Sequence, residues 1–197
     1  MALPTPEVQI KQAADTAKIF MDAYYDAINR RRPTASLPAF YISASKAYSA
    51  HTPDISINGL HMTSVADFAK LLEDNYIDDE TAARPPTGPA ASSSSTPRDA
   101  TLPQVRYEIE AYDAHVLNPD FNIAAPPAVL EAKDKTGAKC SVLMQVTGRV
   151  YYGRGRDAPA KTFNETFVLV PNWDTFGRNP PKGMRRWLVM SQNFRTL

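Results

Sequence analysis

The second half of the chain alternates apolar and polar residues in long runs, and this period of two is typical of half-buried β-strands. The longest run is Cys140–Tyr152, whose apolar side chains fall on one face. Further strands of this kind are predicted at Val105–Tyr112, Thr162–Val170 and Trp187–Leu197. Strands with one apolar face need a layer that covers this face, so we expect an antiparallel sheet packed against helices.

The first part of the chain supplies such helices. Apolar residues recur at spacings of three and four from Val8 to Arg32, which predicts one long amphipathic helix. Three consecutive arginines, Arg30, Arg31 and Arg32, close this helix, where cations suit the negative end of the helix dipole. Pro33 follows them and stops the helix.

Two further helices are predicted before the long strands. Leu37–Ser43 carries apolar residues at helical spacing, which predicts a short helix. Ser64 and Asp67 resemble a capping box, so a third helix is expected to begin there.

Short strands are predicted between these two helices, at Lys46–Ala50 and Ile55–Ile57, and Asn58 with the glycine after it is a turn signal. Helices that precede a run of long strands define an α+β fold. We therefore expect three helices packed on a curved, mainly antiparallel sheet.

Residues 1–197 are predicted to form a single domain with two irregular segments. Residues 78–103 are rich in proline and serine and have almost no apolar side chains to bury, which predicts a disordered insertion. This insertion is either a plain surface loop or a segment that binds a partner. Residues 118–137 are also irregular, but Phe121 and Ile123 predict an ordered loop that packs locally or offers a further contact surface.

Charge and cysteine content argue against several classes of protein. The formal net charge is only +1, which does not favour a free-standing nucleic-acid binder. The single cysteine, Cys140, can form no intramolecular disulfide, and this favours a reducing compartment. No apolar run approaches about 18 residues, and the first residues lack a signal peptide, so no membrane association is expected.

No metal or cofactor is expected from the motifs. The three histidines have no metal-ligand spacing with Cys140. The sequence also has no glycine-rich phosphate loop and no Gly-x-Ser-x-Gly motif.

Six segments carry a family resemblance, and they are residues 17–32, 37–45, 55–72, 144–152, 162–170 and 187–197. Their order and spacing, together with the aromatic and arginine residues at the end of the last segment, resemble the nuclear transport factor 2 family. Apart from the two irregular segments, the resemblance covers most of the chain. It implies a cone-shaped domain in which the long strands coil around the helices.

Within this family the chain resembles the small subunit of the heterodimeric mRNA export receptor, particularly its fungal form. The two irregular segments fit the longer loops of the fungal form. Family importers that carry the GDP form of the Ran GTPase use an acidic loop, but this chain has Arg154 and Arg156 at the matching place.

The resemblance also implies partners and a location. The chain is expected to pair with the large subunit of the receptor, which carries a similar domain. It is expected to help this subunit bind the phenylalanine-glycine repeats of nuclear pore proteins and RNA cargo, without being an enzyme. Its expected location is the nucleus and the nuclear pore complex, with shuttling to the cytoplasm.

The resemblance implies that two such domains pack sheet to sheet, so the outer face of the sheet is the predicted partner interface. Arg195 matches a family arginine that pairs with an acidic residue of the partner. The other face of the last strand carries bulkier residues and should meet the helices. The predicted interface consists of Val189, Ser191, Asn193 and Arg195 from the last strand, with Gln145, Thr147 and Arg149 from the longest strand.

Glu165 is an unexpected residue in this scheme. It shares one strand face with Phe163 and Phe167, so it falls among apolar neighbours. Either it pairs with a buried hydrogen-bond donor, or this face of the sheet meets the partner.

Two other functions stay open at this point. A homodimeric import carrier of the same family would need an apolar, self-complementary sheet face, whereas the predicted face is polar. A cone-fold isomerase or dehydratase would need an acid or a histidine beside a tyrosine in an open cavity, whereas a filled cone would favour binding. The candidates for such chemistry are Tyr24, Tyr48, His61, His115 and Glu165.

Clusters of arginine are candidates for direct contact with RNA. Such contact would depend on salt and would not be specific for sequence. The competing interpretation is an ordinary solvated surface. The candidates are Arg30, Arg31, Arg32, Arg154 and Arg156, with a further pair at Arg185 and Arg186.

Overall fold

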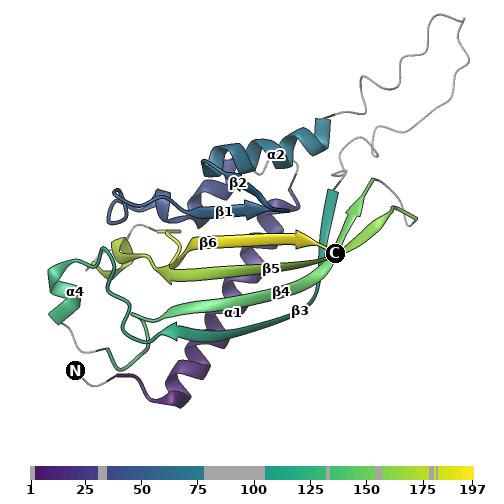
Figure 1. Cartoon of the computed structure of the whole chain (residues 1–197). Helices are drawn as coiled ribbons and strands as arrows, with labels where there is room; N and C mark the ends of the chain where they lie inside the picture. Colours follow the sequence, from purple (N-terminus) through teal and green to yellow (C-terminus); the bar gives the residue numbers. More distant parts are fainter. Residues whose placement is uncertain are drawn as a thin grey trace, which may run out of the picture.

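The chain folds around one curved six-stranded sheet, one face of which is crossed by a long helix (Figure 1). The computed structural model describes residues 3–30, 35–77, 105–131, 134–153, 157–177, 180 and 182–197. The helices are α1 (Pro6–Ile28), α2 (Val65–Ile77) and α4 (Pro127–Glu131), with 3-10 turns η2 (Leu37–Phe40), η3 (Ile42–Ala44) and η5 (Trp173–Phe176). The strands are β1 (Asp54–Ile57), β2 (Leu60–Met62), β3 (Val105–Asn118), β4 (Ser141–Tyr152), β5 (Ala160–Pro171) and β6 (Trp187–Thr196).

The strands lie in the order β2-β1-β6-β5-β4-β3. Neighbours are antiparallel except for β1 and β6, which run parallel. This topology confirms the predicted α+β fold with a mainly antiparallel sheet. None of the described helices is both long enough and apolar enough to cross a membrane.

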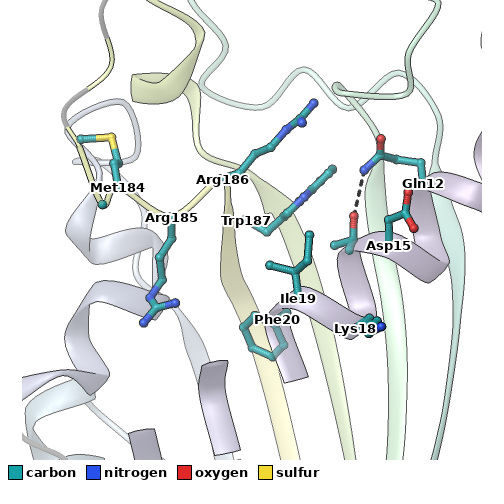
Figure 2. Close-up of a pocket in the computed structure, with 11 residues that line it drawn as sticks. Gln12, Asp15, Lys18, Ile19, Phe20, Met184, Arg185, Arg186 and Trp187 are labelled. Atoms are coloured by element: carbon teal, nitrogen blue, oxygen red, sulfur yellow. Dashed lines mark hydrogen bonds between the residues drawn. The ribbon is translucent and has the colours of Figure 1, made fainter. Parts of the chain in front are cut away.

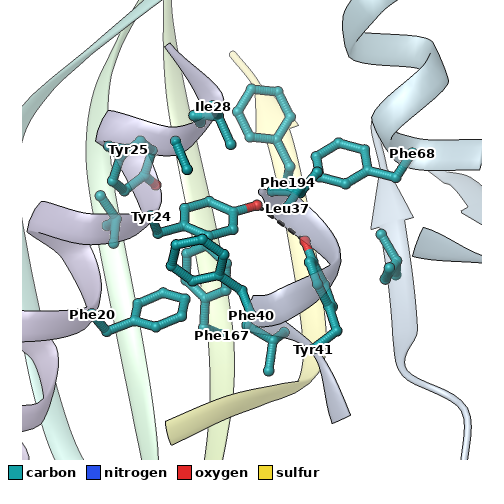
Figure 3. Close-up of a cluster of buried hydrophobic side chains, with 14 of the residues drawn as sticks. Phe20, Tyr24, Tyr25, Ile28, Leu37, Phe40, Tyr41, Phe68, Phe167 and Phe194 are labelled. Atoms are coloured by element: carbon teal, nitrogen blue, oxygen red, sulfur yellow. Dashed lines mark hydrogen bonds between the residues drawn. The ribbon is translucent and has the colours of Figure 1, made fainter. Parts of the chain in front are cut away.

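An aromatic cluster holds α1 against the sheet (Figure 3). Phe20 and Tyr24 stack with 5.2 Å between their ring centroids, and both meet Phe167 of β5 edge-on. Phe40 of η2 meets Tyr24 in the same manner at 5.3 Å. Large buried rings contribute more to stability than any other side chain of a core, so this cluster fixes the position of α1 across the sheet.

A second apolar cluster forms where the segment between β3 and β4 packs against η5. Phe121 stacks on Trp173 with 6.2 Å between ring centroids, and the indole nitrogen of Trp173 donates to the carbonyl oxygen of Ile123 at 2.8 Å. The segment therefore packs through Phe121, while the Ile123 side chain stays 44% exposed. The insertion predicted at 78–103 lies outside the described residues.

Helix α1 ends at Ile28, earlier than the sequence predicts. The next residue, Asn29, pairs with the backbone of Tyr107 in β3. Its amide donates to the Tyr107 carbonyl at 3.0 Å, and its Oδ1 accepts from the Tyr107 amide at 2.8 Å. This pairing ties the helix end to the sheet, so Arg30 lies beyond the last helical turn.

The short hairpin uses a different segment from the predicted one. Lys46–Ala50 forms turns instead of a strand, because Tyr48 is buried in the second cluster and donates its hydroxyl to Pro171 O at 2.8 Å. The antiparallel partner of β1 is β2, which follows the turn at Asn58 and Gly59. Both turn residues have positive φ angles, 51° and 86°, for which Asn-Gly is the favoured pair.

Helix α2 begins where the capping box predicts. The Asp67 amide donates to Ser64 Oγ at 3.1 Å, and the Ser64 hydroxyl donates to the Asp67 carboxylate at 2.8 Å. The hydroxyl of Thr63 donates to the same carboxylate, and these hydroxyl groups hold the pKa of Asp67 below its ordinary value.

A β-bulge shifts the register of β6 near its start. Ser191 pairs with Val168 of β5, and Val189 pairs with Leu169, so Met190 is the extra residue. Before the bulge, side chains that alternate in sequence therefore lie on the opposite face from the one predicted.

The bulge moves Val189 into the core. Its side chain is fully buried in the main cluster, and its backbone bridges to Tyr41. The predicted place of Val189 on the outer, partner-facing side is therefore wrong. Ser191, Asn193 and Arg195 come after the bulge and keep the predicted outer face.

Gly148 marks a close approach between β4 and β3. A Cβ atom at this position would overlap the Glu108 carbonyl oxygen and lie 2.9 Å from the Phe163 ring. We expect Gly148→Ala to lower the free energy of unfolding by about 1–3 kcal/mol, measured by urea denaturation. Gly177→Ala is the matched control, since nothing lies within 4 Å of the added methyl group. Equal stability of the two variants would contradict this prediction.

Candidate protein interface and polar cavity

The outer face of the sheet is open around Arg149 and Arg195. Helices α1 and α2 contribute their buried residues to the core on the other side. The second cluster, with Phe121 and Trp173, covers the outer face only near Val168 and Val170 of β5. Gln145, Arg149, Asn193 and Arg195 are exposed on it, while Thr147 and Ser191 are half-buried between neighbouring strands. The structure thus brings six of the seven predicted interface residues onto one polar surface, and Val189 is the exception.

Arg195 differs from the other arginines of this face. Arg149 forms an ion pair with Glu110, with 2.8 Å between Nε and Oε1, and Arg106 pairs with Glu108. Arg195 has no ion pair with any described residue. Its guanidinium lies over Gly59, where an added Cβ would be 3.1 Å from Nη1. Among the described residues, the face therefore presents Arg195 as a cation without a counter-charge.

The candidates for RNA contact are only partly described. Arg30 pairs with Asp26 one turn back on α1, which offsets its charge. Arg31, Arg32, Arg154 and Arg156 lie outside the described residues.

Arg185 lies over the ring of Phe40, with 3.3 Å from its guanidinium carbon to the ring centroid. Burial lowers the pKa of the Arg185 guanidinium. Arg185 therefore caps the aromatic cluster.

An open groove of about 530 Å³ runs between α1 and the segment before β6 (Figure 2). Ile19 is 68% exposed on its wall. Asp15, Lys18 and Arg186 place charges of both signs around it. The buried polar residue of its lining is Thr16, whose hydroxyl already accepts a hydrogen bond from the Gln12 amide at 3.0 Å.

A polar network runs through the core between α1 and the sheet. Gln192 of β6 is its centre: it accepts from the Tyr41 hydroxyl at 2.5 Å and donates to the Tyr24 hydroxyl at 2.9 Å. The same amide donates to Glu165 at 2.6 Å, and the Tyr25 hydroxyl donates to the other carboxylate oxygen at 2.5 Å. Of the two interpretations of Glu165, the one with buried donors is therefore correct.

Burial dominates the titration of this network. Burial raises the pKa of the Glu165 carboxyl to about 7, although the hydrogen bonds from Tyr25 and Gln192 oppose this rise. Burial also raises the pKa of Tyr24, Tyr25 and Tyr41 well above the ordinary value of a phenol. Near neutral pH these tyrosines are neutral donors, and Glu165 is the group of the network that titrates.

The network borders a cavity of about 240 Å³ at one end of the cone. Tyr24 and Glu165 both reach it, so the cone is not completely filled. The other walls are apolar and come from α1, β1, α2, β3, β4 and β6: Ile28, Ile57, Phe68, Leu71, Leu72, Val105, Tyr107, Tyr152 and Phe194, with Asn58 from the adjoining turn.

The remaining candidates for catalysis do not meet at this cavity. Tyr48 is in the second cluster, and His61 pairs with Asp54 at the exposed edge formed by β2 and β1. His115 is exposed on β3. Only Tyr24 and Glu165 come together, and the described residues contain no group of three or more side chains suited to hold a metal ion.

The sequence pointed to Tyr24 and Glu165 but missed Tyr25, Tyr41 and Gln192. Gln192 was expected on the inner face of its strand, and an amide among bulky apolar residues is the signal that could have revealed the network. Its partners come from three separate elements, so their identity depends on the tertiary structure.

The fold is that of a nuclear transport factor 2-like domain. No family model and no curated protein matches the sequence. Solved structures do match, and Mtr2 and complexes that contain it are among them. The resemblance to the small subunit of the mRNA export receptor is thereby confirmed.

Three solved structures illustrate the likeness. A chain of the Mex67:Mtr2 complex with a bound Sac3N peptide has a TM-score of 0.74 and 26% identity, covering 94% of this chain and 99% of that chain. Mtr2 has a TM-score of 0.72 and 28% identity, with the same coverage. A chain of the Chaetomium thermophilum Mex67 NTF2-like domain complexed with Mtr2 has a TM-score of 0.71 and 27% identity, covering 94% and 98%.

Proposed function

We propose that this chain is the non-catalytic small subunit of a nuclear mRNA export receptor. It pairs through the outer face of its sheet with a larger subunit that carries a similar domain. The observation that carries this proposal is the open polar face with Arg195, which has no counter-charge in the described part of the chain. The likeness to Mtr2, which is complexed with the Mex67 NTF2-like domain, supports it.

The polar character of the face favours two different subunits over two identical ones. In a symmetric pair, residues close to the twofold axis would meet their own copies, so a cation near that axis would face another cation. A different partner can supply a carboxylate instead, and complementary charge then gives specificity. This argument favours the heterodimer over the homodimeric import carrier.

The wider role follows from this pairing. The heterodimer binds phenylalanine-glycine repeats of nuclear pore proteins and carries RNA, and it works in the nucleus and at the nuclear pore complex, shuttling to the cytoplasm. The direct share of this chain in RNA binding is weak, non-specific and dependent on salt, because its net charge is only +1. Residues 78–103 and 118–137 are insertions within its single domain.

Co-expression with the large subunit of the same organism tests the proposal. We expect light scattering to give the mass of one copy of each chain, and the complex to survive gel filtration. The chain alone is the control. A stable homodimer that does not bind the large subunit would favour the import carrier. A monomer that does not bind the large subunit would contradict both the heterodimer and the homodimer.

A further inference from the structure

Glu165 is a buried carboxylate without a counter-ion in the part of the chain that the structure describes. Its residue is only 2% exposed, and no lysine, arginine or histidine in the described ranges forms an ion pair with it. Its hydrogen-bond partners, Tyr25 and Gln192, are both neutral. Removing an ionised carboxylate from water costs more free energy than hydrogen bonds from two neutral donors restore. The negative charge of Glu165 is therefore poorly compensated.

The cavity beside Glu165 has aromatic walls. Phe68 of α2 and Phe194 of β6 line it together with Tyr24 and Tyr107. Figure 3 shows Phe68 and Phe194 at the hydroxyl end of Tyr24. Aromatic faces carry partial negative charge and attract cations, most strongly where water is excluded.

The charge of the site selects among ligand classes. An anion would be repelled by Glu165, and a neutral apolar molecule would leave the carboxylate uncompensated. A cation would pair with the carboxylate in a medium of low dielectric constant and contact the rings at the same time. At about 240 Å³, the cavity is smaller than the usual range for drug-sized ligands, so its ligand must be small.

We propose that this cavity binds a small organic cation, with its ammonium group against the carboxylate of Glu165 and its apolar part against Phe68 and Phe194. The site lies on the helix side of the sheet, away from the outer face that bears Arg195. Binding of the cation is therefore separate from pairing with another subunit.

Binding depends on pH through Glu165. The polar and titratable groups around it and its cavity are Tyr24 and Tyr25 from α1, Tyr41 after η2, Asn58 after β1, Tyr107 from β3, Tyr152 from β4 and Gln192 from β6. None of these carries a charge near neutral pH. The cation binds the ionised carboxylate, so its affinity rises as pH increases through about 7, and binding at pH 7 releases protons.

Two molecules of nearly equal shape test the proposal on the full chain at pH 8. Choline carries a quaternary ammonium group, and 3,3-dimethylbutanol has a neutral carbon in its place. We expect titrations followed by NMR to show choline binding at least about tenfold more tightly. Benzylamine and benzyl alcohol form a second pair for the same comparison.

Glu165→Gln keeps the size of the side chain and the donor and acceptor pattern of the protonated acid, but it cannot ionise. It should reduce the cation preference to within about twofold, whereas the exposed control Glu131→Gln should retain it. Nα-acetyl-lysine methylamide imitates a lysine side chain within a peptide, whereas benzylamine is a free small cation. If the lysine derivative binds more weakly than benzylamine, the ligand is a free small molecule. Equal affinity for cation and isostere in both pairs, or no binding of any cation, would overturn the proposal.

Discussion

Arg195→Glu is expected to separate the two subunits of the proposed heterodimer. Arg195 is the exposed cation of the sheet face that has no ion pair among the described residues. In the proposed complex it pairs with an acidic residue of the large subunit, and removing one partner of such a pair costs roughly 2–5 kcal/mol. The dissociation constant should therefore rise at least about thirtyfold, as measured by titration calorimetry.

Lys18→Glu provides the matched control for this change. Lys18 belongs to α1 on the opposite side of the sheet, so the same reversal of charge there should leave the affinity within about twofold. Thermal unfolding of both variants checks that the domain stays folded. An Arg195→Glu chain that binds the large subunit as tightly as the Lys18→Glu chain would show that Arg195 is an ordinary solvated cation.

Glu165→Gln is expected to stabilise the chain, and more so at alkaline pH. Burial raises the pKa of Glu165 to about 7, from an ordinary value of 4.5. The folded state thus holds a proton that the unfolded state releases between these two values. This contribution to stability is complete below pH 4.5 and is lost as pH rises to about 7, a loss on the order of 3 kcal/mol.

Glutamine can take the place of the protonated acid. It can accept the hydrogen bond from Gln192 and donate to the hydroxyl oxygen of Tyr25, and it does not titrate. Urea denaturation at pH 5 and pH 8 should therefore show a free-energy difference from the natural chain that grows with pH. Glu131→Gln should show no such growth. A difference for Glu165→Gln that is constant between pH 5 and pH 8 would contradict the assignment of the titration to Glu165.

The elements that the sequence predicts well are those that depend on local pattern. The four long strands follow from a period of two, and the start of α2 follows from Ser64 and its neighbours. The outer position of Asn193 and Arg195 follows from the same alternation. Such features need only the order of residues within a few positions.

The features that the sequence does not reveal depend on distant partners. Helix α1 ends early because Asn29 pairs with Tyr107 in β3, 78 residues further along. Val189 turns inward because a bulge at Met190 forms only when β6 pairs with β5. The segment around Tyr48 is not a strand, since its hydroxyl reaches Pro171.

The candidate site also has a part that local pattern predicts and a part that depends on distant partners. Alternation predicted which residues share the polar outer face, apart from Val189, and the role of this face as an interface stays a prediction from the family resemblance. The network around Glu165 was not predicted. Its members lie on α1, on β5, on β6 and at Tyr41, the residue after η2. No spacing within one segment records that these side chains meet.

The position of β6 in the sheet has a consequence for how the chain is made. This strand is translated after all the others, yet it lies between β1 and β5 and links the early hairpin to the three long strands. The sheet cannot close until β6 has left the ribosome. Because β6 also carries Arg195 and Asn193, the chain completes this sheet and the face proposed to bind a partner in the same step.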